Sequence, residues 1–245
     1  MPRKKKTDDP IGVGLTAKQM RRKKPINADL LVDIDPLTDN QEKLYTEYDA
    51  GKHIFAYGCA GTGKTFIAMY LALKEVMNRP DLYRQLIIIR SIVPTREIGF
   101  LPGGEDEKKQ AYTIPYRSIC YDLFGYNEAW PKLVTQKKVK FESTSFIRGS
   151  TFDNAIVIVD EMQNCNFHEL DSIITRVGED CRIIFSGDYY QTDFKHEDEK
   201  SGIIKFLGII EQLRFFRMIE FGWEDIIRSD LVRDYIMTKE MLKVS

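Results

Sequence analysis

The 245-residue sequence has little cysteine, no long apolar run and no large excess of charge of either sign. Its four cysteines lie far apart, without a CxxC pair or a histidine at zinc-ligand spacing, which argues against a disulfide framework and a structural zinc site. No run approaches the roughly 18 apolar residues of a membrane span, and the basic start MPRKKKTDDP lacks the apolar stretch of a secretory signal. We therefore expect a soluble cytoplasmic protein with no membrane partner.

The near-zero net charge of −1 conceals an uneven distribution. Residues 1–24 contain nine lysines and arginines against two aspartates, a net charge of +7, while the remainder carries 27 basic and 35 acidic residues, a net charge of −8. Basic and proline-rich sequence continues to residue 35. Its large apolar side chains are too few for their burial to offset the entropy lost on ordering the chain. We expect a basic, disordered tail over 1–35 and a single folded domain over 36–245.

Helix and strand patterns alternate after residue 36. A helix is expected over residues 41–48, capped by Thr38 or Asp39, and another from 64 to about 78. Short, continuous apolar runs typical of interior parallel strands occur at 53–57, 86–89, 155–159 and 182–185. Strands separated by helical segments imply crossovers that cover both faces of a sheet. The sequence thus predicts an α/β fold, with helices packed on a mostly parallel central sheet.

A glycine-rich motif follows the first expected strand. It satisfies the phosphate-loop pattern GxxxxGK[ST] at every position and comprises Gly58, Cys59, Ala60, Gly61, Thr62, Gly63, Lys64 and Thr65. The glycines allow backbone N–H groups to converge on phosphate oxygens at the positive end of the following helix. Lys64 would contact the β- and γ-phosphates, and the Thr65 hydroxyl would bind Mg²⁺. The pattern predicts a site for ATP and Mg²⁺; a plain glycine-rich turn is the alternative.

Polar side chains also follow the third and fourth apolar runs. Asp160 is placed to hold Mg²⁺ through water, and Glu161 to orient or deprotonate the attacking water. Acids at a strand end are weak evidence alone, because many of them cap helices, but the phosphate loop strengthens the functional interpretation. Asp188 and Gln191 would face the same crevice, since the carboxyl ends of parallel strands open onto one edge. That pair would sense the γ-phosphate, unless Asp188 simply caps a helix.

Together these motifs resemble the PhoH family of phosphate-loop ATPases, which are similar to the first motor domain of superfamily 1 helicases. The matching stretches are GCAGTGKT (58–65), IIIRSIVPTREIGFLPG (87–103), FIRGSTFDNAIVIVDEMQN (146–164), ITRVG (174–178), SGDYYQTD (186–193) and FGWEDIIRSDLV (221–232). The resemblance implies a RecA-like three-layer sandwich. It also implies that Gln163 and Gln191 are γ-phosphate sensors, that Gln41 contacts adenine, and that Arg90 lies where helicases contact the nucleic-acid backbone.

The resemblance further implies a ring of identical subunits. A superfamily 1 helicase completes its nucleotide site with arginines from a second motor domain, whereas only a short segment follows the fourth expected strand here. We therefore expect a homo-oligomer, a hexamer by family resemblance, in which each subunit lends an arginine to its neighbour. Arg228 and Arg176 lie in matching segments and are the candidates, although each could equally be a surface ion-pair residue.

Basic and aromatic side chains are interleaved between residues 103 and 145. Such a mixture suits single-stranded nucleic acid, with charges following the phosphates and rings stacking on bases, but it is also typical of an amphipathic packing face. We expect Mg²⁺-dependent ATP hydrolysis coupled to binding, unwinding or remodelling of RNA or single-stranded DNA. The alternatives are an ATP-dependent protein-interaction switch without nucleic acid, and a metabolite kinase, which would need an acceptor site.

Overall fold

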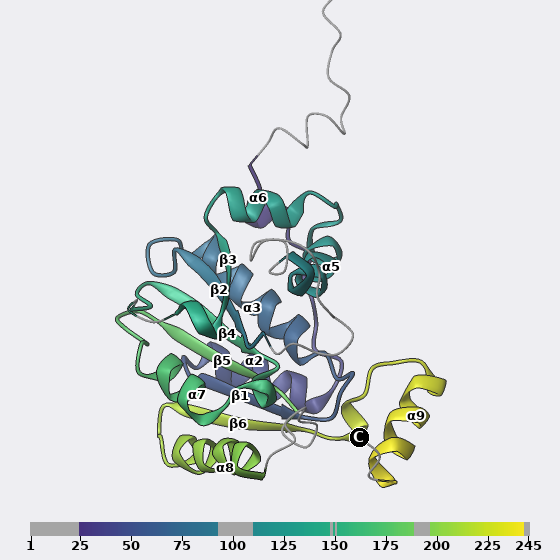
Figure 1. Ribbon diagram of the computed structural model, residues 1–245. Helices are drawn as coiled ribbons and strands as arrows, with labels where there is room; N and C mark the ends of the chain where they lie inside the picture. The colour runs from purple at the N-terminus through teal and green to yellow at the C-terminus, as the bar shows by residue number, and fades with distance from the viewer. Residues whose placement is uncertain (1–24, 93–109, 148, 150, 189–196, 243–245) are drawn as a thin grey trace, which may run out of the picture.

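The computed structural model describes residues 25–92, 110–147, 149, 151–188 and 197–242. Its centre is a six-stranded sheet in the order β3-β2-β4-β5-β1-β6, in which every strand pair is parallel (Figure 1). The strands are β1 (His53–Gly58), β2 (Gln85–Arg90), β3 (Val139–Ser143), β4 (Ala155–Asp160), β5 (Arg182–Gly187) and β6 (Phe216–Phe221). Because all six run the same way, their carboxyl ends lie along one edge of the sheet.

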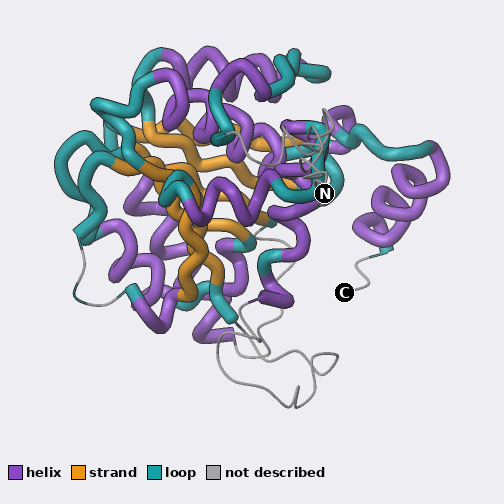
Figure 2. Tube along the Cα trace, turned by 90° about the horizontal axis from the view of Figure 1, so that it is seen from above, coloured by secondary structure: helices purple, strands orange, loops and turns teal. Residues whose placement is uncertain are grey.

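Helices cover both faces of the sheet and make three layers (Figure 2). One face packs against α2 (Asp39–Asp49), α3 (Lys64–Asn78), α5 (Ile114–Phe124) and α6 (Ala129–Thr135). The other face packs against α7 (Phe167–Ile174) and α8 (Glu197–Glu211), while α9 (Asp230–Met241) lies beside the sheet. Within the described ranges, no helix is long and apolar enough to cross a bilayer. The three-layer α/β, RecA-like arrangement predicted from sequence is confirmed.

Short 3₁₀ helices join several of these elements. They are η1 (Ala28–Leu30), η3 (Thr144–Phe146), η4 (Met162–Asn164) and η5 (Trp223–Asp225). Two of them follow a strand after a single residue, η4 after β4 and η5 after β6. Both therefore start at the carboxyl edge of the sheet.

The four strands predicted from apolar runs are all interior strands of the sheet. Each lies between two hydrogen-bonded neighbours, and the runs at β4 and β5 are buried at all six positions. The two strands that the apolar runs did not predict, β3 and β6, are the outermost strands of the sheet. The edge strands mix buried and exposed positions, so they lack the continuous apolar run by which interior strands were identified.

The folded part begins earlier than the predicted boundary at residue 36. Ile26 is 6% exposed and belongs to the core, and Leu30 and Ile34 pack against it. The backbone N–H of Val32 donates to the carbonyl of Leu123 at 2.9 Å. These sparse apolar residues form no core of their own but cover the core of the domain, so the expected tail over 1–35 is wrong for residues 25–35. Residues 1–24 lie outside the described part of the chain.

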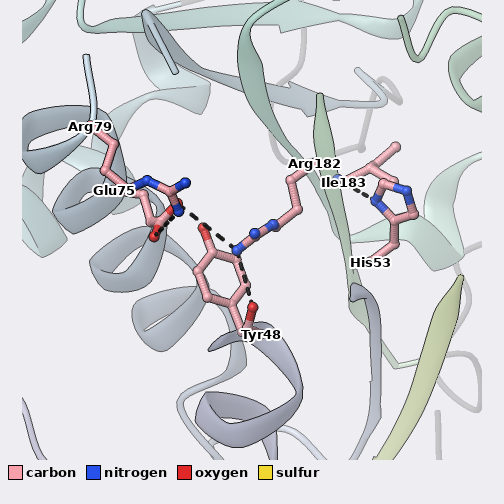
Figure 3. Close-up of polar contacts among 6 residues, drawn as sticks. All are labelled: Tyr48, His53, Glu75, Arg79, Arg182 and Ile183. Atoms are coloured by element: carbon pink, nitrogen blue, oxygen red, sulfur yellow. Dashed lines mark hydrogen bonds and ion pairs between the residues drawn. The ribbon is translucent and has the colours of Figure 1, made fainter. Parts of the chain in front are cut away.

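The amino end of β5 carries a buried cation (Figure 3). The Arg182 guanidinium donates to the carbonyl of Tyr48 at 3.1 Å and lies 4.4 Å from the centroid of the Tyr48 ring. It also lies 5.5 Å from the ring of Tyr83 and 4.0 Å from the carboxylate of Glu75. Arg79 pairs with the same carboxylate at 3.4 Å. The charge is therefore compensated by groups from α2, α3 and the segment before β2, which ties these elements to the sheet.

Candidate nucleotide-binding site

The phosphate loop connects β1 to α3 and depends on glycine at the points where its backbone turns. Gly58, Gly61 and Gly63 have φ values of +113°, +77° and +82°, a region that side chains disfavour. At Gly58 a Cβ atom would lie 2.2 Å from the carbonyl oxygen of Phe221 on the adjacent β6. The N–H of Cys59 donates to that same oxygen at 2.9 Å. The loop thus runs against β6, and only glycine fits at its start.

Lys64 is held inside the phosphate loop. Its ammonium group donates to the carbonyls of Gly58 at 2.9 Å and Cys59 at 2.6 Å, and to the Thr62 hydroxyl at 3.2 Å. The side chain is only 8% exposed. Burial lowers its pKa, although Asp188 and neighbouring acids act in the opposite direction. The lysine that the motif assigns to the phosphates therefore sits at the centre of the loop, surrounded by oxygen atoms.

The two predicted magnesium ligands meet in the structure. The Thr65 hydroxyl, in the first turn of α3, donates to Asp160 Oδ1 at the end of β4 at 2.6 Å. The Thr65 hydroxyl also lies 3.3 Å from the hydroxyl of Ser186 on β5. Asp160 is 4% exposed, and its second oxygen accepts from the Tyr116 hydroxyl at 2.8 Å.

This donor set fits Mg²⁺ bound together with phosphates. Hydroxyl and carboxylate oxygens are hard ligands, and Mg²⁺ is commonly held by one or two carboxylates plus substrate phosphates and water. In the described ranges, no group of three or more histidines, cysteines or acids could form an all-protein cage. Thr65 and Asp160 would hold the ion, which when bound would neutralise phosphate charge.

Glu161 follows Asp160 in a left-handed conformation. Its φ is +49°, uncommon for a residue other than glycine. The carboxylate accepts a short hydrogen bond from the side-chain amide nitrogen of Gln163, and the side-chain amide oxygen of Gln163 accepts from the backbone N–H of Asp188 at 3.0 Å. Burial and then the charge of Asp160 raise the pKa of Glu161. The network ties the ends of β4 and β5 together and holds Glu161 in one position.

Arg90, at the end of β2, faces these acids. Burial acts to lower the pKa of its guanidinium, but Tyr116, Glu161 and Asp160 outweigh that effect and raise it. The guanidinium also lies 5.9 Å from the ring of Tyr112. Arg90 pairs with Asp160 across β2 and β4, so its charge offsets that of the acids, and the nucleic-acid contact implied by the family resemblance remains a prediction.

Gln41 packs against the phosphate loop. It is 1% exposed, its amide nitrogen donates to the carbonyl of Thr62 at 2.9 Å, and its amide oxygen accepts from the N–H of Leu37 at 2.7 Å. Thr38, one of the two expected caps of α2, accepts from the N–H of Gln41. Both ends of the amide already bond within the chain, so the adenine contact remains a prediction.

The candidate arginines lie at opposite ends of the sheet. Arg228 lines the cavity of its own chain, with its Cγ 3.0 Å from the Cβ position of Gly61. Arg176 lies beside the segment that enters β4, where its carbonyl accepts from the N–H of Phe152 at 2.8 Å. Arg228 therefore lines the site of its own subunit, and Arg176 is not among the residues that line it. Gln191 lies outside the described residues.

These groups surround one cavity of about 580 Å³ at the carboxyl edge of the sheet. Its lining includes Ala60, Gly61, Thr62, Gly63, Lys64, Thr65, Asp160, Glu161, Gln163, Ser186, Asp188 and Arg228. The volume is in the range of small-molecule sites, about 300–1,000 Å³. The opposite wall is formed by Pro115, Ser118 and Asp122 of α5. Neither this wall nor the Tyr116 bond to Asp160 was predicted, because no motif marks α5 as a neighbour of the loop.

Comparison with known proteins gives one consistent family. A family model described as PhoH-like protein matches residues 33–240. Protein PhoH of Escherichia coli (strain K12) is 34% identical over 180 residues, which cover 73% of this chain and 50% of that protein. The PhoH-like protein of Synechocystis is 33% identical, with 76% of this chain and 56% of that protein covered. The chain therefore spans about half the length of these curated relatives.

The chain also matches solved structures at low similarity. The Hef helicase domain of Pyrococcus furiosus is 15% identical with a TM-score of 0.42, over 76% of this chain and 38% of that one. The SWI2/SNF2 ATPase core of Sulfolobus solfataricus, solved in complex with dsDNA, is 9% identical with a TM-score of 0.44, over 80% of this chain and 46% of that one. Similarities this low say nothing about function.

Proposed function

Because the chain belongs to the PhoH-like protein family, we propose that it is a Mg²⁺-dependent ATPase built on one RecA-like domain and coupled to RNA or single-stranded DNA. The observation that carries the ATPase proposal is the bond between Thr65 and Asp160, 2.6 Å long, beside the buried ammonium group of Lys64. Two segments far apart in the sequence bring together the three groups that a phosphate loop uses to hold a nucleotide and its metal.

The chemistry follows from the position of each group. The phosphate-loop N–H groups and Lys64 would bind the phosphates and stabilise the charge that develops during transfer. Glu161 would orient the attacking water and accept its proton, and its raised pKa suits a general base. Gln163 would hold that carboxylate in position. Arg228 would add positive charge from within the same subunit.

ATPase assays on two variants test this function. Lys64→Ala removes the phosphate contact, while Glu161→Gln keeps the shape of the base but not its basicity, so hydrolysis should fall about 10²-fold or more in each. Glu161→Gln should still bind ATP. Lys43→Ala, an exposed lysine on α2, is the matched control and should keep the wild-type rate. Phosphate transfer from ATP to a small acceptor in place of water would favour the kinase alternative.

The nucleic-acid partner is tested by the same assay with polymers added. We expect RNA or single-stranded DNA to stimulate hydrolysis and duplex DNA to do so less. The basic and aromatic residues between 110 and 145 support this expectation, because they suit a strand with exposed bases. A rate that no polymer changes would favour the interaction-switch alternative.

We also propose a ring of identical subunits, with Arg176 rather than Arg228 reaching the neighbouring site. The support is the placement of Arg176 away from the cavity of its own chain. In an equal mixture of Lys64→Ala and Arg176→Ala subunits, about a quarter of the sites should be complete if the arginine acts across the interface. The two separate variants would be nearly inactive. A strict monomer by sedimentation that retains full activity would contradict the ring.

A further inference from the structure

A second cavity, of about 480 Å³, lies outside edge strand β3, between the strand and helices α5 and α6. Its apolar wall includes Trp130, Val134 and Phe141. None of the residues that line it also lines the phosphate-loop cavity. The two cavities are therefore separate sites on the same domain.

Three basic side chains line the same cavity, and its described lining contains no acid. They are Arg117, Lys137 and Lys140. Lys140 pairs with Glu142 at 2.7 Å but remains 58% exposed, and the Arg117 Nε donates to the hydroxyl of Thr113, the residue before α5, at 3.0 Å. A surface that combines aromatic rings with excess positive charge suits a flat base joined to a phosphate.

One buried side chain connects this cavity to the candidate magnesium ligand. The ring of Tyr116 stacks on Trp130, with centroids 6.2 Å apart and planes 24° apart, and lies 5.8 Å from the ring of Phe141. Tyr116 is fully buried, and its hydroxyl donates to Asp160 Oδ2 at 2.8 Å. The wall of the outer cavity and the end of β4 are thus separated by a single residue.

We propose that the outer cavity binds one nucleotide unit of a single strand, and that Tyr116 is a positioning residue that transmits its occupancy to Asp160. This inference rests on the proposed function and adds to it the place where the strand binds. A base seated against Trp130 and Phe141 packs against the two rings that hold the ring of Tyr116. Any shift of that ring changes how its hydroxyl orients the Asp160 carboxylate.

Tryptophan fluorescence tests the binding site directly. The chain has two tryptophans, so Trp223→Phe leaves Trp130 as the reporter. We expect oligo(U) or oligo(dT) to quench Trp130, and the Arg117→Ala/Lys137→Ala double variant to bind about tenfold more weakly. For this variant, the slope of log affinity against log salt concentration should become shallower by the equivalent of about one to two phosphate contacts. Lys43→Ala controls for the loss of one exposed positive charge and should bind as the wild type does.

The outcomes separate failure of the site from failure of the function. If the wild type binds no strand of either kind, the nucleic-acid part of the proposed function is wrong and the site falls with it. If it binds strands but the double variant matches it in affinity and salt dependence, only the site is wrong. Quenching of Trp130 by free UMP or dTMP but by neither polymer would also overturn the site.

The coupling is tested with Tyr116→Phe, which keeps the ring and removes the hydroxyl. We expect strand binding and Trp130 quenching to persist, while the ratio of stimulated to unstimulated ATPase falls at least fivefold. A purely structural role would lower the melting temperature and leave that ratio unchanged. Phe141→Leu is the second test, because it loosens the packing of the Tyr116 ring on the side of the outer cavity and leaves the Tyr116 bond to Asp160 in place. An unchanged ratio in both variants would overturn the coupling.

Discussion

The amino edge of the central sheet, where its strands begin, and the carboxyl edge, where they end, use charge in opposite ways. At the amino edge, the Arg182 guanidinium has a carbonyl, two aromatic rings and a carboxylate around it, all from the same chain. At the carboxyl edge, Lys64 is surrounded by loop oxygens, and Glu161 is kept in a left-handed conformation. Strained and desolvated groups that face a cavity are typical of functional sites, whereas fully paired buried charges are typical of structural ones. The comparison assigns stability to one edge and chemistry to the other.

Lys64→Ala is the sharpest test of the carboxyl edge. The substitution removes a cation aimed at the phosphates, so we expect ATP hydrolysis to fall about 10²–10³-fold. Stability should change little, because the lysine is desolvated and its partners belong to a loop beside a cavity. Steady-state ATPase rates and thermal melting measure the two effects. A large fall in melting temperature would break the distinction between the edges, because the loop would then be a structural element.

Arg182→Met is the corresponding test of the amino edge. Methionine keeps much of the length but loses the bond to the Tyr48 carbonyl and the contacts with both rings. We expect a loss of roughly 2–3 kcal/mol in the free energy of unfolding, from the unpaired carbonyl and the lost cation–π contacts. Urea denaturation measures it, and the exposed Arg84→Met is the control. The ATPase rate per folded molecule should be unchanged, and a lower rate would show that this edge also affects the site.

The same division explains how much of the fold followed from sequence. Interior strands are buried on both faces, so each is a continuous apolar run that can be identified without knowing its neighbours. The edge strand β3, Val-Lys-Phe-Glu-Ser, has buried ends around more exposed residues, a pattern that a surface loop can share. Likewise, Ile26 and Ile34 are too sparse to suggest a core until the helices that they cover are known.

The site was predictable where one motif contains the chemistry. The phosphate loop and the Asp160-Glu161 pair each follow an apolar run, and parallel strands necessarily bring their ends together. Tyr116 lies on a helix whose sequence says nothing about Asp160, 44 positions away. Arg228 was one of two candidates to act on a neighbouring subunit, and only the path of the chain after β6 shows that it lines the cavity of its own subunit. Contacts that depend on how separate elements pack have no local signal.

His53 gives the amino edge a pH dependence of its own. Its Nδ1 accepts from the N–H of Ile183 at 3.2 Å, which only the neutral ring can do on that atom. Burial, and then the charge of Arg182, lower its pKa below 6.5 in the folded state. Protonation therefore favours the unfolded chain. The contribution of neutral His53 to the free energy of unfolding is thus complete above pH 6.5 and is lost as the pH falls below it.

His53→Asn keeps an acceptor and removes the titration. We expect the melting temperature of the wild type to fall more steeply than that of the variant between about pH 7.5 and 5.5. The difference should be smaller than the effect of Arg182→Met, because His53 is partly exposed and its charge can be hydrated. Parallel plots of melting temperature against pH for the wild type and the variant would show that protonation of His53 does not favour the unfolded chain, and that the amino edge owes its stability to Arg182 rather than to His53.

Glu240→Gln tests whether a contact made by an unburied helix at the carboxyl edge can change the reactivity of the Cys59 thiol without changing the stability of the fold. Glu240 lies on α9, none of whose residues is buried, and accepts from the Cys59 thiol at 3.4 Å and from the indole of Trp223. Burial, and then the Glu240 charge, raise the pKa of Cys59 to about 12. Removing the charge should lower that pKa, with about tenfold more thiolate at pH 8.5 for each unit lost.

Iodoacetamide labelling of Cys59, followed by peptide mass spectrometry, measures the change. The exposed Glu211→Gln on α8 controls for the loss of one negative charge and should leave the labelling rate unchanged. The melting temperature should stay the same in both variants, because α9 contributes no buried residue to the core. ATP should slow labelling in the wild type if it occupies the loop that contains Cys59. Equal labelling of the wild type and Glu240→Gln would mean that burial alone keeps the thiol unreactive. The carboxyl edge would then depend on packing as much as the amino edge does.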